Sequence, residues 1–357
     1  MFRINSTFLT LTPASSQFRG GVKRINEGVF PATGKKNTLV KSPLYHTTGL
    51  FFLLFSILLA ACQPVATAGN PAANGIKVLA VESFLADIAH NVAGDRATVD
   101  SLVPLGLDPH AFEPAPKDVA RIAESAVLLV NGGGLEAWLN PVLSNVGGQR
   151  LVVTASTGLT SRMAREGEAV EAVPSGGLEQ GDPHFWLNPL NVITYVQNIR
   201  DGLTQADPAG KDIYAANAAA YIAQLKDLDA WIQQRVSAIP VQNRLLVTNH
   251  ESFGYFADRY GFTIAGTIIP SVTTDSSPSA QELARLVDQI KATGVRAIFL
   301  ELGSNPQLAE QVAAETGVKV VTDLYTHSIT APGGDAPTYI DMMKVNVTKI
   351  VQALQGQ

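Results

Sequence analysis

Cysteine is almost absent from this chain, since Cys62 is the only one among 357 residues. A single cysteine cannot form an internal disulfide, and it excludes a metal site of the CxxC type. Charged residues are also scarce at 16%, whereas hydrophobic residues make up 46%. This composition is typical of a folded protein with a sizeable core and excludes a disordered chain.

The chain also lacks an apolar run long enough to span a membrane. The most apolar stretch, GLFFLLFSILLAAC (Gly49 to Cys62), holds about a dozen apolar residues, whereas a spanning helix needs ~20. It ends in LAAC, the lipobox pattern of bacterial lipoproteins. We therefore predict that residues 1–61 are a signal region that is removed, and that lipidated Cys62 anchors the mature chain to the cell membrane. The alternative is an anchor that is never cleaved.

Basic residues become scarce after the lipobox. Residues 62–357 hold 19 Lys or Arg against 30 Asp or Glu, a net charge of −11. This acidity argues against nucleic acid as a partner and is compatible with cations.

The basic segment before the apolar run is long for a signal peptide, so we expect translation to begin nearer Leu39 or Val40. Residues 62–75 are small, proline-containing and uncharged, and are predicted to form a flexible tether.

The remaining chain alternates between strand-like and helix-like patterns. VLLVNGG (Val127–Gly133) and RLVVTAS (Arg150–Ser156) are rich in β-branched residues and indicate buried strands. Directly before the first of these strands, PKDVARIAESA (Pro116–Ala126) has helical apolar spacing. Alternation of this kind favours an α/β fold with mostly parallel sheets.

A long helix is predicted at the centre of the sequence. Residues 208–239 are rich in alanine and contain no proline after Pro208 and no glycine after Gly210. A helix of about 25–29 residues would be some 40 Å long. We interpret it as a connector between two α/β lobes, residues 76–207 and 240–357. The alternative is an ordinary long surface helix.

The chain has six histidines, and four of them fall in predicted loops. His46 lies in the signal region, and His90 lies near the end of a predicted helix, where the helix dipole favours it structurally. Loops at the carboxyl ends of parallel strands are where open α/β sheets bind ligands. The four loop histidines are His110, His184, His250 and His327.

Two of these histidines share a local context, DPHAFEP around His110 and DPHFWLNP around His184. Aspartate can bond nearby backbone and proline fixes one dihedral, so both loops should be stiff. Stiffness suits a metal ligand, because coordination at about 2.0–2.1 Å tolerates little drift. Two ligands from each lobe would place a metal between the lobes. The alternative is four unrelated exposed histidines.

From about Ile76 onward the chain resembles a known family, the metal-binding solute-binding proteins of bacterial ABC importers, which capture zinc or manganese. The resemblance rests on DPHAFEPAPKD, NGGGLEAWL, DPHFWLNP, HESFGYFADRYG, SPSAQELARLVDQIKATGVRAIFLE and DAPTYIDMMKVN. It implies two α/β lobes bridged by one rigid helix, with the metal clamped between them. It also implies metal binding by His110, His184 and His250. Histidine at the third position is typical of the zinc-type members, so Zn²⁺ is the expected ligand and Mn²⁺ the alternative.

The fourth position departs from the family, because LYTHS places His327 where an aspartate usually stands. Four neutral imidazoles would leave the charge of a divalent cation uncompensated, and we expect Glu251 and Glu301 to balance it nearby. Alternatively Asp323 or Glu301 binds the metal and His327 does not. The loop Arg162–Gly181 has four glutamates and no histidine, and is either a flexible flap that weakly attracts cations or an ordinary loop.

The resemblance implies a monomeric extracytoplasmic binding protein, not an enzyme, that captures Zn²⁺ and presents it to the membrane permease of an ABC importer. A second candidate is a zinc hydrolase, since three histidines with an open fourth place can activate water. Four nitrogen ligands would close that place. A third candidate is a surface adhesin, which lipid anchoring would permit.

Overall fold

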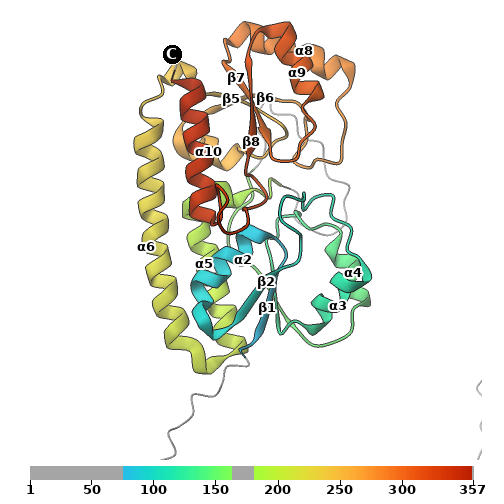
Figure 1. The fold of residues 1–357 in the computed structure, drawn as a ribbon, viewed down its shortest axis with the longest axis vertical. Coiled ribbons are helices and arrows are strands. Elements are labelled where there is room, and N and C mark those ends of the chain that lie inside the picture. The colour runs from blue at the N-terminus through green and yellow to red at the C-terminus, as the bar shows by residue number, and fades with distance from the viewer. Residues whose placement is uncertain (1–74, 163–180, 356–357) are drawn as a thin grey trace, which may run out of the picture. The chain divides into compact units, whose positions relative to one another are not determined.

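The computed structural model describes residues 75–162 and 181–355, all within one compact unit of the chain. Two four-stranded sheets, each wholly parallel, have the strand orders β2-β1-β3-β4 and β6-β5-β7-β8 (Figure 1). The predicted architecture of two α/β lobes with parallel sheets is therefore confirmed. The strands are β1 (Lys77–Ala80), β2 (Thr98–Ser101), β3 (Val127–Val130), β4 (Leu151–Thr154), β5 (Leu245–Thr248), β6 (Thr263–Thr267), β7 (Ala297–Glu301) and β8 (Lys319–Leu324).

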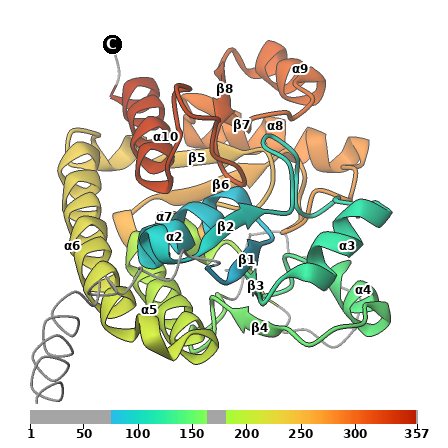
Figure 2. The ribbon, with the colours of Figure 1, turned by 60° about the horizontal axis from the view of Figure 1, so that its bottom comes forward.

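Each sheet is covered by helices on both faces, as Figure 2 shows for the first sheet. In that sheet Val127 and Leu129 pack towards α2 and α5, whereas Leu128 and Val130 pack towards α3 and α4. Alternate residues of a strand point to opposite faces, so continuous apolar runs are what a doubly covered sheet requires. The helices of this N-terminal lobe are α2 (Ser83–Ala93), α3 (Pro116–Glu124), α4 (Leu139–Asn145) and α5 (Pro189–Ala206).

The C-terminal lobe repeats this arrangement. Val247, Ile298 and Leu300 pack with α8 and α9, while Leu246 and Phe299 belong to the larger core cluster that includes α7 and α10. Its helices are α7 (Gly254–Tyr260), α8 (Ala280–Thr293), α9 (Gln307–Thr316) and α10 (Tyr339–Leu354). Short 3-10 turns are η2 (Gly94–Arg96), η3 (Phe185–Leu187), η4 (Pro208–Gly210) and η5 (Val241–Asn243).

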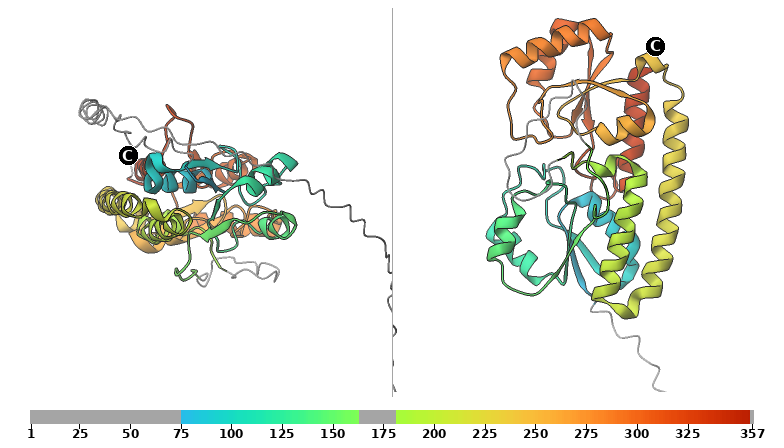
Figure 3. Two further views of the ribbon diagram at one scale, coloured as in Figure 1. Left: turned by 90° about the horizontal axis from the view of Figure 1, so that it is seen from below. Right: turned by 180° about the vertical axis from the view of Figure 1, so that it is seen from behind.

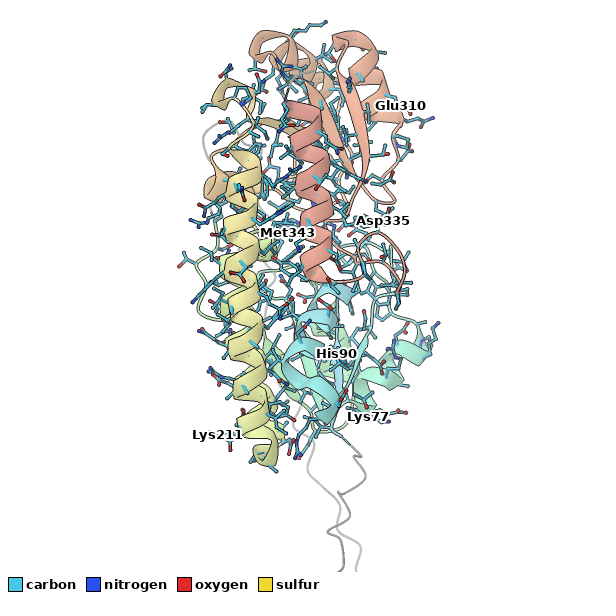
Figure 4. The ribbon with its side chains drawn as sticks, turned by 60° about the vertical axis from the view of Figure 1, so that its left-hand side comes forward. Lys77, His90, Lys211, Glu310, Asp335 and Met343 are labelled. Carbon is cyan, nitrogen blue, oxygen red and sulfur yellow. The ribbon has the colours of Figure 1, made fainter. Side chains whose placement is uncertain are left out.

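The long helix α6 (Lys211–Val236) has 26 residues and a length of about 39 Å. It packs on α2 and α5 of the first lobe and on α7 and α10 of the second (Figures 1 and 3). On the α10 side, the buried Met343 lies towards α6 (Figure 4). One continuous helix along both lobes limits how far they can move relative to each other.

The predicted signal region, the lipobox with Cys62, and most of the Arg162–Gly181 loop lie outside the described residues. Within the ranges that are described, none of the helices combines the length and the apolar character needed to cross a membrane.

Candidate metal centre

The four loop histidines converge at one point between the two sheets. The Nε2 atom of His184 lies 3.3 Å from Nε2 of His110, 3.1 Å from Nε2 of His250 and 3.2 Å from Nε2 of His327. The four nitrogen atoms all lie within 4.8 Å of one another, and all four residues are buried. Ligands at ~2.0–2.1 Å from a tetrahedral ion are themselves ~3.3–3.4 Å apart. The cluster therefore has the size of a single-ion site.

The two DPH loops form the same local turn. The backbone N–H of His110 donates to Oδ1 of Asp108, and the backbone N–H of His184 donates to Oδ1 of Asp182, both at 2.9 Å. An aspartate that bonds the backbone two residues on fixes the turn before either ring is placed. The repeated tripeptide is thus a repeated mechanism for holding a histidine.

The two loops differ in what surrounds the turn. Trp186 lies beside the ring of His184, with centroids 5.2 Å apart, and beside the ring of His327 at 5.7 Å. In the other loop Phe112 packs edge-on against Trp138 at 5.2 Å. The aromatic side chain therefore supports the ring directly at His184, whereas at His110 it supports the loop.

Asp182 also contacts the ring of its own histidine. Its Oδ1 lies 2.8 Å from Nδ1 of His184, so Nδ1–H donates to the carboxylate when Nε2 carries a lone pair towards the cluster. Burial raises the pKa of Asp182 to about 8, opposed by the His184 backbone hydrogen bond and by the charge of Arg162. A cation bound at the four nitrogens would lower this pKa again, because it favours the charged carboxylate.

Glu301, at the end of β7, contacts both histidines of the C-terminal lobe. Its Oε1 lies 2.6 Å from Nδ1 of His250, and its Oε2 lies 3.3 Å from Nδ1 of His327. The hydroxyl of Ser252 also donates to Oε1 at 3.2 Å. Burial opposes ionisation of this carboxyl, but the two histidines more than offset it and hold the pKa of Glu301 well below its ordinary value. A single carboxylate thus orients two imidazoles and carries negative charge next to the cluster.

The expectation that Glu251 balances charge beside the ligands stays a prediction. Glu251 is half-buried and lines a small pocket with Arg162 and Phe253. Its charge raises the pKa of Asp182. Asp182 is a second carboxylate that contacts a ring, and sequence reasoning did not assign it that role. The sequence could have predicted this contact, since the aspartate of each DPH tripeptide stands two residues before the histidine.

Three of the clustered histidines, His110, His184 and His327, have shifted pKa values. Burial is the main cause that lowers the pKa of His110 and His184 well below the ordinary value, and neighbouring histidines add to it. Burial also acts to lower the pKa of His327, but the hydrogen bond and charge of Glu301 raise it overall. His110 and His184 are therefore neutral and can bind a cation directly. A cation that binds His327 must compete with a proton.

The alternative fourth ligand, Asp323, does not reach the cluster. Its side chain is exposed and accepts a hydrogen bond from the Thr322 hydroxyl at 2.8 Å. His327 is 7% exposed and faces the other three histidines. His90, for which the sequence predicts a structural role, is exposed near the end of α2 (Figure 4).

The chain resembles known proteins over nearly all of its described length. Residues 78–353 match the model of the family described as zinc-uptake complex component A, periplasmic. A manganese-binding lipoprotein of Halalkalibacterium halodurans is 33% identical over 302 residues, which cover 85% of this chain and 96% of the relative. A metal ABC transporter substrate-binding lipoprotein of Streptococcus parasanguinis is 33% identical over 305 residues, which cover 85% of this chain and 95% of that relative.

Solved structures of periplasmic metal-binding proteins also resemble this chain. The periplasmic zinc-binding protein TroA of Treponema pallidum superposes with a TM-score of 0.70 at 27% identity, covering 78% of this chain and 99% of that one. The family model spans the two lobes and the four histidines. These relatives are substrate-binding proteins and not enzymes, and the buried site described above offers ligands for an ion. The chain therefore belongs to the family of periplasmic metal-binding proteins that act as substrate-binding components of ABC importers.

Proposed function

We propose that this protein captures Zn²⁺ outside the cytoplasmic membrane and presents it to the permease of an ABC importer. The observation that carries the metal assignment is the donor set, four imidazole Nε2 atoms with three Nε2–Nε2 distances of 3.1–3.3 Å. Imidazole suits zinc, whereas manganese prefers carboxylate, carbonyl and water oxygen. Asp182 and Glu301 supply negative charge to three of the rings.

Capture without chemistry is supported by the same donor set. A catalytic zinc site keeps one position open for water, and four nitrogen ligands occupy all positions of a tetrahedral ion. His184 and His250 are wholly buried, and His110 and His327 are 8% and 7% exposed. A closed and buried site suits a carrier that holds its ion tightly until a partner opens the lobes.

Mn²⁺ is the second candidate, and the name of the Halalkalibacterium halodurans relative favours it, since that protein is called manganese-binding. Glu301 lies within reach of two of the rings, so a small shift would add a carboxylate oxygen to the donor set. Such a mixed set would favour Mn²⁺ more than four nitrogens do.

Competition between the two ions decides between these candidates. The mature apo-protein is titrated with Zn²⁺ and with Mn²⁺ against a chelator of known affinity for each. We expect Zn²⁺ to bind at least about tenfold more tightly. The variant His250→Glu should shift the preference towards Mn²⁺, and His90→Glu, at an exposed histidine, is the matched control. Equal or tighter binding of Mn²⁺ by the wild type would overturn the zinc assignment.

Delivery at the membrane is the other half of this proposal. Both relatives are named lipoproteins, and one is named as part of a metal ABC transporter, which supports anchoring through Cys62 and a permease partner. We propose that the variant Cys62→Ser leaves the membrane fraction and lowers uptake of ⁶⁵Zn by the cells that produce it. Retention of this variant in the membrane would contradict lipidation at Cys62. The monomeric state and the adhesin alternative stay predictions.

A further inference from the structure

Beside the histidines, the C-terminal lobe holds a cavity of about 660 Å³, which we call the side pocket. Segments that follow all four strands of the second sheet contribute to its lining, together with residues 106–108 and Thr274. In open α/β sheets, ligands bind outside the carboxyl ends of the strands where the strand order reverses. Here the reversal lies between β5 and β7. Asn249 follows β5, Glu301 ends β7, and both line the side pocket.

We propose that the side pocket binds a small metal chelate, that is, a divalent cation still held by amino-acid-sized chelators, with a net charge of zero or above. The ion would then pass from the chelate to the four histidines. This inference rests on the proposed function only in taking the histidines as the destination of the ion.

The size of the side pocket exceeds what a hydrated ion needs. Six waters at ~30 Å³ each occupy about 180 Å³, less than a third of the cavity. Pockets for small organic ligands typically measure about 300–1,000 Å³. The cavity therefore matches a metal ion that arrives with organic ligands, and not an ion with water alone.

The lining has an apolar part and a polar part. Leu107 and Leu302, 51% and 38% exposed, come from different lobes, and Ile268 and Leu308 add further apolar surface. Apolar walls offer nothing to the waters of a hydrated ion, but they bury the carbon skeleton of a chelator. The polar part of the lining comes from Asn249, Ser304 and Asn305. Their amides and hydroxyl can form hydrogen bonds with the amino and carboxylate groups of the chelator.

The charge of the lining selects among chelates. Asp108 and Glu301 line the cavity, and among the residues that the structure describes its lining includes neither lysine nor arginine. A complex with net negative charge would meet repulsion from these two carboxylates, which no lysine or arginine of the described lining offsets. Neutral or positive complexes, such as those of Zn²⁺ with histidine, are accepted, whereas anionic complexes such as zinc citrate are excluded.

Transfer to the histidines needs only a short path. His327 and Glu301 line the side pocket and also belong to the metal centre. Each imidazole Nε2 that binds the ion displaces one donor atom of the chelator. The chelator leaves with the same atoms and electrons it brought, and takes up a proton from solution where its pKa requires one. His327 is the first ring that a chelate in the side pocket meets, and its Nε2 lies 3.2 Å from that of His184.

Stopped-flow loading of the mature apo-protein tests this inference. Zn²⁺ is supplied either as its neutral histidine complex or as its citrate complex, and both are buffered to the same free Zn²⁺ concentration. The fluorescence of Trp186, which lies beside His184 and His327, reports arrival of the ion. We expect the loading rate to rise with the concentration of the histidine complex at fixed free Zn²⁺, and to stay constant with citrate.

A variant that fills the side pocket provides the second arm. Ser304→Phe should keep the equilibrium affinity for Zn²⁺ and lower the loading rate from the histidine complex by about tenfold or more. Ser144→Phe, at an exposed position on α4, is the matched control. Leu308→Trp, a second filling variant, guards against a folding defect in the first, and unchanged zinc affinity verifies the fold of each.

Equal loading rates from both complexes at equal free Zn²⁺ would overturn the inference, as would filling variants that load like the wild type. Failure of the proposed function is a separate result. If the protein binds Mn²⁺ in preference to Zn²⁺ at equilibrium, the metal assignment is wrong, and the same two arms are run with Mn²⁺ complexes.

Discussion

The indole Nε1–H of Trp186 donates a 2.7 Å hydrogen bond to the backbone carbonyl of Thr326. Trp186 stands two residues after His184 in the first lobe, and Thr326 stands directly before His327 in the second. The indole is wholly buried and stacks on Phe84 at a centroid distance of 4.5 Å. The hydroxyl of Tyr339 donates to the Trp186 carbonyl at 2.6 Å. The loops of two of the clustered histidines, from different lobes, are thus joined by one side chain.

Replacing Trp186 with phenylalanine should uncouple these loops. The variant leaves the Thr326 carbonyl without its indole partner, and a buried acceptor without a partner costs about 1–3 kcal/mol. We expect lower metal affinity and a free energy of unfolding reduced by about that amount, measured by isothermal titration and chemical denaturation.

Trp138→Phe is the matched comparison for the Trp186 variant. Trp138 donates a 2.9 Å hydrogen bond to Pro109 beside His110, but within one lobe and only partly buried. Water can replace that bond, so the loss should be smaller. A larger loss for Trp138→Phe would contradict the importance of the bond between the lobes.

Glu301→Gln should weaken metal binding without removing a ligand. The amide keeps the shape of the side chain but removes the negative charge next to His250 and His327. Loss of such an outer partner typically lowers metal affinity by about 10–100-fold, and a competition titration would measure it. Glu310→Gln, at an exposed position on α9, is the control. Similar losses for both variants would show that net charge matters and the contact does not.

His184→Ala should cost more affinity than His327→Ala. The Nε2 atom of His184 lies within 3.3 Å of the Nε2 atoms of all three other histidines, so its removal opens the centre of the cluster. Removal of His327 leaves Glu301 unpaired on one side, and its carboxylate can then take the vacant coordination position. Metal content and affinity of the two purified variants test this order. Equal losses would exclude Glu301 as a substitute ligand.

His110 and His184 should contribute a loss of stability when the metal-free protein is acidified below about pH 6.5. The pKa values of His110 and His184 are lowered in the folded state, chiefly by burial. The unfolded chain therefore binds protons first, and stability is complete above the unfolded pKa and falls as pH drops below it. His327 and Asp182 act in the opposite direction, because Glu301 raises the pKa of His327 and burial raises the pKa of Asp182 to about 8. The contribution of His110 and His184 is therefore measured by comparison with a variant that lacks both.

Urea denaturation of the metal-free protein at pH 7.5 and pH 5.5 measures this effect. The double variant His110→Gln/His184→Gln should show a weaker pH dependence than the wild type, and His90→Gln should show the same dependence as the wild type. An unchanged slope in the double variant would assign the acid sensitivity to other groups.

Several local features could be predicted because they depend on neighbours in the chain. The helix α8 begins at a capping box of Ser279 and Glu282 and ends at Gly294, whose φ of +74° suits glycine. The buried strands β3 and β7 were visible as apolar runs. The strands β2 and β6 escaped prediction, because their sequences TVDS and TIAGT contain polar or small residues in place of such a run. The edge strand β4 was still visible, since it carries the run LVVT.

The sequence by itself determined the turns that hold the first two histidines, since each depends on a hydrogen bond between an aspartate and the residue two positions on. Only the tertiary structure decided which groups surround the site. His184 and His327 stand 143 positions apart, and Glu301 reaches the rings of His250 and His327 from the end of β7. Those contacts arise because parallel strands end at the same edge of each sheet and the long helix sets the two edges face to face, which no local spacing encodes.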